Sequence, residues 1–471
     1  MLIKRKKLKQ IITQIQTTKI GCVVTCHNYG SYLKDCIDSL LNQTLKFEQI
    51  IIILDNCSDN SKSIVLQYKD IEFYEIILGS GGESFNFGVE KLNDNIKYIV
   101  HVDADNKLHN EFNEFAIKNF KDPTIGLVYP HVISIDKNNN IIGNGADHEF
   151  DINILRRNNF IDTCTIIRQE AFIPWDKFRF LDDWNFNLKL FHNGWKFSYQ
   201  PEAKFYYRLH EMQISHEVNK NMKISRLYVH KNSFRTTIVT AFAGREYMLD
   251  KYFEKLNGFD NLEQFNLIAI NTSSDLSFTN KLKYKLNNCK LKSYLYLEHI
   301  INPKGMKASD FTNSAEMRIQ YEVETNLIVA EIYNLARNNI SNCDFVLFWE
   351  DDIIFEKDDL DKLLSEMNIN VDVIGGLVRQ RFGGGNTEFE LNSNSKMIPV
   401  KRKSGIYPVH ATGFGMTLFR VEVINNIRFR VKDELKYFDW SYGQDCKDFG
   451  YYWFAHGDVV CKHYSKDGSY V

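Results

Sequence analysis

The chain has 471 residues, a formal net charge of −2 and a hydrophobic fraction of 44%. This length allows two or three domains with sizeable cores. The near-neutral charge gives no overall attraction toward nucleic acids or anionic membranes. Nine scattered cysteines without a CxxC pair argue against a disulfide scaffold or a zinc site, and suit a reducing compartment.

Residues 1–17 form a basic segment that begins MLIKRKKLKQ. It lacks the apolar stretch of a secretory signal, and no apolar run in the chain approaches the length of a transmembrane helix. A solvated amphipathic helix is the simpler interpretation, and a peripheral membrane contact through its basic side chains is the alternative. We therefore expect a soluble, cytoplasmic protein.

A strand–helix–strand pattern opens the next segment. The apolar, β-branched run Cys22–Thr25 is followed by the turn sequence HNYG, and then by apolar residues at helical spacing over Tyr32–Leu41. Ile50–Leu54 is long enough for one buried parallel strand. Asp55 follows it directly, at the end of the strand where open α/β sheets bind ligands.

A pair of aspartates follows the next predicted strand, Tyr98–Val102. In Asp103-Ala104-Asp105 the alternate side chains of an extended chain point the same way, and carboxylate oxygens suit magnesium or manganese. A chain of this length shows about one such DxD by chance, and we interpret a second one, Asp359 with Asp361, as a structural helix start. The position of Asp103 and Asp105 directly after a strand favours a metal site.

Three further motifs complete the first half of the chain. Asp182 and Asp183 precede a predicted helix at Trp184–Phe191, where acids also serve as caps. A glycine-rich stretch, Gly79–Gly82 and then Asn86, would let backbone N–H groups approach an anion. A short strand ends at His210, and further strands are predicted at Ile125–Tyr129 and Lys196–Tyr199.

In this order, the motifs resemble those of family-two glycosyltransferases with the GT-A fold. The resemblance implies a donor site for a nucleotide sugar, a divalent metal (Mn or Mg) and an acceptor site. Phe85 stands where the family often has arginine, which puts one phosphate contact in doubt. The implied roles are nucleotide-sugar binding by Thr25, His27, Asn28, Asp55, Gly81 and Asn86, metal binding by Asp103, Asp105 and His210, base catalysis by Asp183, and acceptor contact by Asp182 and Trp184.

The same layout begins again near residue 234, with predicted strands at Thr236–Phe242, Phe265–Ile270 and Phe345–Trp349. Alternating strands and helices predict mainly parallel sheets. We predict an α/β protein of two tandem GT-A (Rossmann-like) domains. The predicted parts are a basic helix (1–17), domain 1 (18–217), a connecting helix (218–233) and domain 2 (234–471).

Domain 2 carries a more divergent set of the same motifs. Glu350-Asp351-Asp352 follows a strand, and Gln444-Asp445 is predicted to open a helix. By resemblance, Asp352 and His463 would bind metal, Asp445 would be the base and Asp275 would contact the nucleoside. The alternative is that domain 2 has lost catalysis and binds the acceptor. The loop Gly383–Gly385 could close over the sugar or be a plain surface loop.

These features lead to a metal-dependent, inverting transferase that moves a hexosyl or N-acetylhexosaminyl group from a nucleotide sugar, UDP-linked in our interpretation. The acceptor would be a hydroxyl of a glycan, lipid-linked or protein substrate, with one site in each domain. One alternative is transfer to hydroxylated bases of viral DNA, with basic residues such as Arg379, Arg381, Lys396 and residues 401–403 contacting phosphates. Another is a sugar-binding module without turnover.

Overall fold

The computed structural model describes residues 18–145, 148–177, 181–211, 213, 220–299, 315–378, 389–391, 397–399, 402–432, 435, 437–467 and 469–470. The basic segment 1–17, the Gly383–Gly385 loop and most of the basic residues considered for DNA contact lie outside these ranges. The chain divides into two units, Met1–Ser225 and Arg226–Val471, which are described separately below. Within the described residues, no helix combines the length and the apolar character that a membrane span requires.

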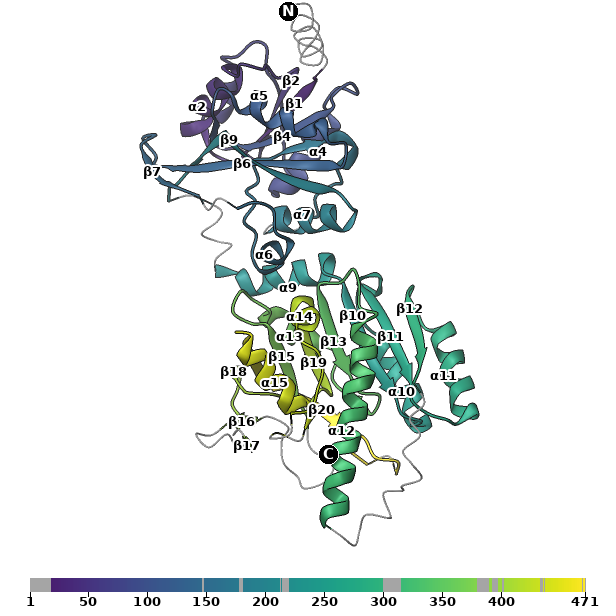
Figure 1. Ribbon diagram of the computed structural model, residues 1–471. Helices are drawn as coiled ribbons and strands as arrows, with labels where there is room; N and C mark the ends of the chain where they lie inside the picture. The colour runs from purple at the N-terminus through teal and green to yellow at the C-terminus, as the bar shows by residue number, and fades with distance from the viewer. Residues whose placement is uncertain are drawn as a thin grey trace, which may run out of the picture. The chain divides into compact units, whose positions relative to one another are not determined.

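Unit 1 is built on a nine-stranded sheet in the order β3-β2-β1-β4-β8-β6-β9-β5, with β7 paired to β6 (Figure 1). Its strands are β1 (Ile20–Cys26), β2 (Gln49–Asp55), β3 (Glu72–Ile76), β4 (Tyr98–Asp103), β5 (Lys107–Leu108), β6 (Ile125–Ile135), β7 (Ile141–Asn144), β8 (Ile166–Arg168) and β9 (Lys196–Arg208). Its helices are α2 (Gly30–Leu41), α3 (Ser61–Val65), α4 (Gly81–Glu90), α5 (Phe112–Ala116), α6 (Ile152–Arg157) and α7 (Asp182–His192).

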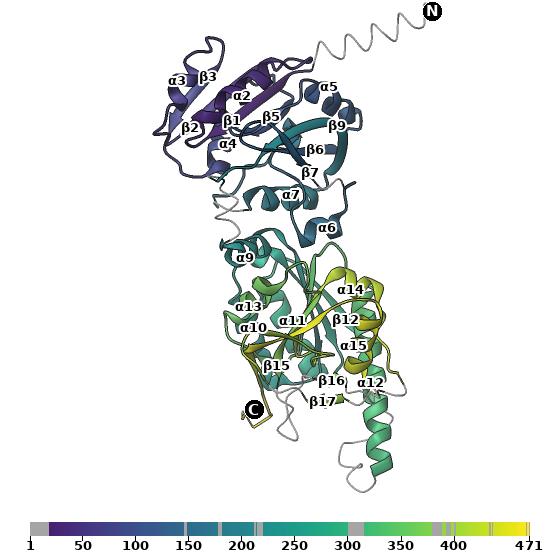
Figure 2. The same cartoon turned by 90° about the vertical axis from the view of Figure 1, so that its left-hand side faces the viewer.

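Helices cover both faces of the unit 1 sheet. Alternate residues of β1, such as Cys22 and Val24, form one buried cluster with Leu33 and Ile37 of α2, and Figure 2 shows α2 alongside β1 and β2. Val23 points to the other face, where α4 packs so closely that a Cβ on Gly88 would lie 2.3 Å from Val23 Cγ1. The unbroken apolar runs predicted for β1 and β2 thus reflect burial on two sides.

Unit 2 also has a nine-stranded sheet, in the order β12-β11-β10-β13-β19-β15-β20-β14, with β18 paired to β20. Its strands are β10 (Thr236–Phe242), β11 (Phe265–Asn271), β12 (Tyr294–Glu298), β13 (Phe345–Trp349), β14 (Ile353–Ile354), β15 (Val373–Val378), β18 (Ile406–Pro408), β19 (Met416–Arg420) and β20 (Trp453–His463), and the separate pair is β16 (Phe389–Leu391) with β17 (Met397–Pro399). Its helices are α10 (Glu246–Asn257), α11 (Leu276–Asn288), α12 (Ala315–Arg337), α13 (Asp359–Glu366), α14 (Val421–Asn426) and α15 (Phe438–Asp448). A further helix, α9 (Met222–Ser233), runs across the division between the units.

Eight strands of each sheet follow the same order and chain connection, and only the ninth differs, since β7 pairs with β6 while β18 pairs with β20. The first four strands of each order pair in parallel, and the next strand is antiparallel to both of its neighbours. The two-residue end strands β5 and β14 are antiparallel to β9 and β20. The pair β6 with β9 and its counterpart β15 with β20 are both parallel. Each pair contains an irregularity near its middle. The predicted α/β class with two mostly parallel sheets is confirmed.

Three local predictions differ from the structure. The strands predicted at Lys196–Tyr199 and before His210 are one strand, β9, because it pairs with β6 on both sides of a bulge after Pro130. The glycine-rich stretch is not a loop throughout, since Gly81 begins α4 behind the cap Ser80. The predicted helix start at Gln444–Asp445 is wrong, because α15 begins at Phe438 and places Asp445 within the helix.

Candidate functional site

The carboxyl ends of β1, β2 and β4 open into a cleft of about 550 Å³ in unit 1. This is where parallel strands of an α/β sheet bring their terminal side chains together. Most residues that the sequence predicted for the site line this cleft, namely Thr25, His27, Asp55, Gly81, Asp103, Asp105, Asp182 and Asp183. Asn28, Asn86, Trp184 and His210 are not among its lining residues.

Asp103 and Asp105 lie at the floor of the cleft in different environments. Asp103 accepts hydrogen bonds from Thr25 Oγ1 at 3.0 Å and from Thr163 Oγ1 at 2.7 Å. Asp105 is buried, its Oδ2 lies 3.0 Å from His210 Nε2, and its buried Oδ1 has no hydrogen-bond partner among the described residues. Burial raises the pKa of Asp105. A buried carboxylate oxygen without a hydrogen-bond partner is suited to contact a hydrogen-bond donor or a cation.

These two carboxylates fit a divalent cation that is only partly coordinated by protein. The described residues contain no group of three or more metal-ligating side chains of the His, Cys, Asp or Glu type. Magnesium and its relatives are commonly held by one or two carboxylates, with phosphate oxygens and water in the remaining positions. The donor set of Asp103 and Asp105 is therefore suited to a metal that arrives with a phosphorylated ligand.

His210 supports Asp105 from outside the cleft. Its ring packs edge-on against Tyr29 at 5.5 Å between ring centroids and lies tilted against Tyr32 at 4.8 Å. With its side chain 3% exposed and its Nε2 on Asp105, His210 is placed to orient that carboxylate. The sequence-based expectation was a third metal ligand, and this geometry instead favours a supporting role.

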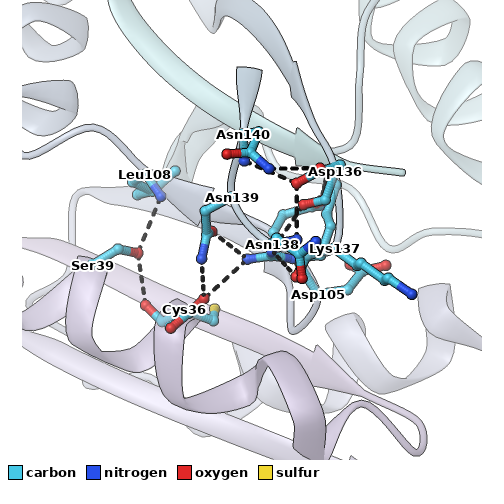
Figure 3. Close-up of polar contacts among 12 residues, drawn as sticks. Cys36, Ser39, Asp105, Leu108, Asp136, Lys137, Asn138, Asn139 and Asn140 are labelled. Carbon is cyan, nitrogen blue, oxygen red and sulfur yellow. Dashed lines mark hydrogen bonds and ion pairs between the residues drawn. The ribbon is translucent and has the colours of Figure 1, made fainter. Parts of the chain in front are cut away.

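Arg208 fixes the turn that carries Asp105, and sequence reasoning did not single it out. Its side chain is fully buried and donates from Nε to the Asp105 carbonyl at 2.8 Å, while its backbone N–H donates to Asn106 Oδ1 at 2.9 Å. The guanidinium also reaches the carbonyls of Asp136 and Lys137. Figure 3 shows this network between Asp105, the Asp136–Asn140 turn and the helix that carries Cys36 and Ser39. A buried arginine therefore holds the loop that carries Asp105 in place.

Replacing Arg208 by methionine is expected to lower the free energy of unfolding of unit 1 by about 3 kcal/mol, because each buried acceptor left without a donor costs ~1–3 kcal/mol. It should also weaken Mn²⁺ binding. Arg168→Met is the matched control, since Arg168 donates to the carbonyls of Phe120, Asp122 and Ile125 away from the cleft. Denaturant unfolding and Mn²⁺ titration would measure both effects. Equal loss of Mn²⁺ affinity in the two variants would contradict the positioning role.

The opposite side of the cleft is formed by the first turn of α7. Asp183 Oδ1 accepts from the Trp184 backbone N–H at 2.8 Å, and its Oδ2 accepts from Asn159 Nδ2 at 2.7 Å. Burial raises the pKa of Asp183 to about 6 and raises the pKa of Asp182 well above its usual range. With a pKa of about 6, Asp183 is mostly ionised at neutral pH, and it stays close to the range in which a carboxylate can accept a proton.

The part of the cleft at the end of β2 is organised by Asp55. Its carboxylate accepts from the backbone N–H groups of Leu78 and Gly79, both at 2.8 Å, and from Ser84 Oγ at 2.9 Å. Gly79 has φ +73°, a left-handed conformation that glycine adopts readily. Asp55 thus shapes the turn into α4 and presents Gly79, Ser80 and Gly81 to the cleft. His27 Nδ1 lies 2.7 Å from the Asp55 carbonyl, which ties the two strand ends together.

Two residues of unit 1 that the resemblance assigned to the site, Asn86 and Trp184, have structural partners instead. Asn86 Nδ2 donates to the Trp175 carbonyl and Asn86 Oδ1 accepts from the Trp175 backbone N–H, at 2.8 Å each. Both polar atoms of the Asn86 side chain are therefore used within the fold. The Trp184 indole is buried and donates to the Leu155 carbonyl at 2.7 Å, so it anchors α6 and does not face an acceptor. Phe85 is fully buried against His101 and Trp175, so the position that often holds arginine is part of the core here.

Asn28 has φ +60° and uses its side-chain oxygen to accept from the Ser58 backbone N–H at 2.7 Å. It therefore stabilises the loop after β1.

Two cleft residues were missed by sequence reasoning. Asp162 lines the cleft, and burial raises its pKa to about 7. His101 is buried on β4, with its Nε2 3.0 Å from Thr25 Oγ1 and 3.8 Å from Asp103 Oδ1. A histidine inside an otherwise apolar strand was the available signal for His101. Asp162 lies in an irregular segment where the sequence offers no periodicity.

Unit 2 carries the same strand-end turn. Tyr98 pairs with Arg168 as Phe345 pairs with Arg420, which makes Asp103 equivalent to Glu350 and Asp105 equivalent to Asp352. The turns match, because Asn106 N–H donates to the Asp103 carbonyl at 3.0 Å and Ile353 N–H donates to the Glu350 carbonyl at 3.2 Å. Asp352 is also contacted by a histidine, since its Oδ2 lies 3.3 Å from His463 Nε2. Asp352 and His463, which were each predicted to bind a metal, therefore lie next to each other.

The surroundings of Asp352 differ, however, because Arg245 Nε lies 2.9 Å from its Oδ2 and Arg245 Nη1 contacts Asp351. A guanidinium therefore lies where the sequence predicted a metal.

Asp445, predicted as the second base, is instead held in an ion-pair network. Arg430 contacts it with two nitrogens, at 2.8 and 2.7 Å, and Lys432 Nζ lies 2.8 Å away. Although burial alone would raise the pKa of Asp445, the hydrogen bonds from Arg430 and Lys432 lower it. A carboxylate so strongly stabilised as an anion is a poor proton acceptor.

Asp439 is the structural counterpart of Asp183. Each is the second residue of its helix, and Asp439 Oδ1 accepts from the Trp440 backbone N–H at 2.9 Å, as Asp183 does from Trp184. Burial raises the pKa of Asp439 to about 6. The shared Asp-Trp dipeptide was the signal in the sequence.

Asp275 is an exposed helix cap. Its Oδ1 accepts from the backbone N–H groups of Ser277 and Phe278 at the start of α11. The residue at the end of β11 is Asn271, whose amide donates to Thr279 and Tyr296 and accepts from the Ser273 backbone. The predicted nucleoside contact was therefore placed four residues beyond the strand end.

Residues 22–175 match the family model described as glycosyl transferase family 2. Among curated proteins, the poly-beta-1,6-N-acetyl-D-glucosamine synthase of Staphylococcus epidermidis is 27% identical over 118 residues, which covers 24% of this chain and 28% of that protein. The synthase of the same name from Staphylococcus aureus (strain COL) is 24% identical over 202 residues, which covers 39% of this chain and 48% of that protein. The chain thus spans less than half the length of these relatives.

Solved structures with similar folds include S. aureus TarS 1-349, at 11% identity and a TM-score of 0.38, covering 74% of this chain and 87% of that one. The mannosyltransferase PcManGT of Pyrobaculum calidifontis, solved with GDP-Man and Mn²⁺, matches at 14% identity and a TM-score of 0.35, covering 46% of this chain and 63% of that one. The family match covers β1, β2 and β4, whose ends form the floor of the cleft. Unit 1 of this chain therefore contains a glycosyl transferase family 2 domain.

Proposed function

We propose that unit 1 is a metal-dependent, inverting glycosyltransferase that moves a sugar from a nucleotide sugar to an acceptor hydroxyl. The observation that carries the proposal is one cleft with two kinds of carboxylate, a strand-end pair suited to a cation and a helix-start carboxylate with a raised pKa. The glycan-synthase relatives support a sugar chain as acceptor. A UDP-linked hexose or N-acetylhexosamine is the donor class to test first, with lipid-linked and protein acceptors as further candidates.

Each side of the cleft has a separate task in this proposal. Asp103 and Asp105 would hold Mn²⁺ or Mg²⁺, which when bound neutralises the charge of the departing diphosphate. Asp55 holds the turn that presents the backbone of Gly79 and Gly81 to the donor.

Asp183 would act as the general base. Asn159 and the Trp184 backbone hold both of its oxygens, which fixes the direction in which the carboxylate can accept a proton from an acceptor hydroxyl. The deprotonated hydroxyl attacks the anomeric carbon as the diphosphate leaves, so a single displacement inverts the configuration there. The neighbouring Asp182, whose pKa burial raises well above its usual range, would contact the acceptor.

Transferase activity is expected to rise with pH through about 6 and to reach a plateau near neutrality. The reason is that Asp183 must be ionised to accept a proton, and burial raises its pKa to about 6. Rates at saturating substrate between pH 4.5 and 8.5 would test this, with circular dichroism at each pH as the control for folding. A rate that is independent of pH across that range in a folded enzyme would argue against Asp183 as the base.

The contacts in unit 2 favour a single metal-dependent site in the chain. The bifunctional enzyme expected from sequence would need Asp352 on a metal and Asp445 as a base, and both are paired with cationic side chains. Of the two roles considered for unit 2, acceptor recognition and a second active site, these contacts favour acceptor recognition. Transfer to hydroxylated DNA bases remains a separate candidate, which salt-dependent binding of duplex DNA would favour.

The direct test is release of nucleotide diphosphate from a panel of nucleotide sugars in the presence of Mn²⁺, with oligosaccharide acceptors. The proposal expects release with a UDP-sugar that depends on both Mn²⁺ and an acceptor. A protein that stays inactive with every donor and acceptor, yet binds glycans, would instead be a sugar-binding module.

A further inference from the structure

Arg245 of unit 2 and Tyr29 of unit 1 occupy equivalent positions. Ile20 pairs with Tyr98 as Thr236 pairs with Phe345, and Tyr29 and Arg245 follow Ile20 and Thr236 at the same distance along the chain. Each is the N-cap residue of the helix after the first strand, α2 or α10. Each also follows a residue with positive φ, +60° at Asn28 and +80° at Gly244. The backbone therefore presents the two side chains in the same way.

In unit 1 this position carries no charge at neutral pH. Tyr29 lines the cleft beside Asp103 and Asp105, and its ring packs on His210. Burial raises its pKa, and the nearby Asp105 and Asp103 raise it further, so the phenol stays neutral. Among the described residues, no lysine or arginine side chain is paired with Asp103 or Asp105, whose nearest basic groups are the rings of His101 and His210.

In unit 2 the same position supplies a permanent positive charge. The Arg245 guanidinium lies between Asp351 and Asp352, with Nε 2.9 Å from Asp352 Oδ2 and Nη1 in contact with Asp351 Oδ1. The side chains of Asp351 and Asp352 are 2% and 1% exposed, while that of Arg245 is 30% exposed. Asp351 Oδ2 also accepts from the Ala243 backbone N–H at 3.0 Å, which ties it to the loop that carries Arg245.

A divalent ion at Asp352, the counterpart of Asp105, would compete with this guanidinium for the same carboxylate. Arginine remains protonated in proteins, so a metal at Asp352 would have to displace a fixed positive charge from two buried carboxylates. Leaving buried carboxylates without their partner is strongly unfavourable. The residues of the unit 2 turn therefore do not fit the metal that the resemblance implied.

We infer that Arg245 is a built-in replacement for the divalent cation, so that unit 2 binds no divalent metal and any metal requirement of the chain lies in unit 1. This inference rests on the proposed function only for the part that concerns unit 1. For unit 2 it rests on the exchange of Tyr29 for Arg245 at equivalent positions beside equivalent acidic turns.

The test is the number of Mn²⁺ ions bound per full-length chain, measured by equilibrium dialysis and by electron paramagnetic resonance. The wild-type protein should bind one Mn²⁺, which Asp105→Asn removes and Asp352→Asn leaves in place. Arg245→Tyr, which installs the unit 1 residue, should bind two, and adding Asp352→Asn to it should return the number to one. Arg430→Tyr is the matched control, since it removes another carboxylate-paired arginine of unit 2 and should leave one ion bound.

A wild-type site that Asp352→Asn removes would overturn the inference, as would an Arg245→Tyr variant that folds and gains no site. If Arg245→Tyr does not fold, Arg245→Gln provides a second variant with a neutral side chain. The measurements on the wild-type protein and on Asp352→Asn test the inference without either Arg245 variant. If wild-type protein binds no Mn²⁺ while Arg245→Tyr binds one, the inference on unit 2 stands and the metal proposal for unit 1 fails.

Discussion

Replacing Asp183 by asparagine is expected to lower kcat by roughly 10²–10⁴-fold, the usual contribution of a positioned general base. Asparagine keeps the shape of the side chain and its contact with the Trp184 backbone, but it cannot accept the proton of an acceptor hydroxyl at neutral pH. KM for the nucleotide sugar should change little, because Asp183 lies on the acceptor side of the cleft in this account. Steady-state kinetics with a donor and a saturating acceptor would measure both constants.

Asp439→Asn is the matched control for this experiment. Asp439 occupies the equivalent place on α15, accepts the equivalent backbone hydrogen bond and also has a pKa of about 6. If unit 1 alone catalyses transfer, Asp439→Asn should leave kcat within about twofold. A large loss in Asp439→Asn with no loss in Asp183→Asn would move the active site to unit 2.

Asp105→Asn is expected to reduce metal-stimulated transfer by roughly 10³-fold, because stabilisation of the departing charge by a bound metal is worth several kcal/mol. The amide keeps the volume of the side chain, yet it removes the negative charge beside the buried Oδ1. Apparent affinity for Mn²⁺ should fall in parallel, which a Mn²⁺ titration of the rate would show. Stability should change less than activity, since burial already raises the pKa of Asp105 and so disfavours its charged form.

Asp361→Asn provides the comparison for Asp105→Asn. Asp361 belongs to the other DxD of the sequence, lies on α13 and pairs with Lys231 Nζ at 2.8 Å. Its replacement should leave both Mn²⁺ dependence and kcat unchanged. An equal loss of metal stimulation in the two variants would mean that the effect of Asp105 is not local to the cleft.

The strand ends of unit 1 could be predicted because they follow unbroken apolar runs. Strands buried on both faces have that pattern, and a charged residue directly after such a strand marks the edge of the sheet where ligands bind. Asp55, Asp103 and Asp105 were found in this way, and all three line the cleft. Their chemical roles come from the resemblance and from the geometry, since the strand pattern alone specifies only position.

The errors in unit 2 have a physical origin in side-chain pairing between distant parts of the chain. Asp445 was chosen because Gln444-Asp445 resembled the acidic pair that opens a helix in the family. In the structure α15 begins at Phe438, and its cap residue Tyr437 makes no side-chain capping bond. Nothing local reveals that Arg430 and Lys432 neutralise Asp445, or that Arg245 reaches Asp351 and Asp352.

The role of Arg208, which holds the loop that carries Asp105, could not be predicted from the sequence. Arginine is usually exposed, so its sequence position beside His210 gave no reason to expect a fully buried side chain. Its partners, the carbonyls of Asp105, Asp136 and Lys137, come from two separate turns. Such a network is visible only after the chain has folded.

The most direct test of the account compares Mn²⁺-dependent release of nucleotide diphosphate by Asp105→Asn and Asp352→Asn, two identical changes at equivalent turns of the two units. The account predicts that Asp105→Asn abolishes release and that Asp352→Asn retains the wild-type rate and the wild-type Mn²⁺ dependence. Loss of release in Asp352→Asn, with wild-type behaviour in Asp105→Asn, would contradict it.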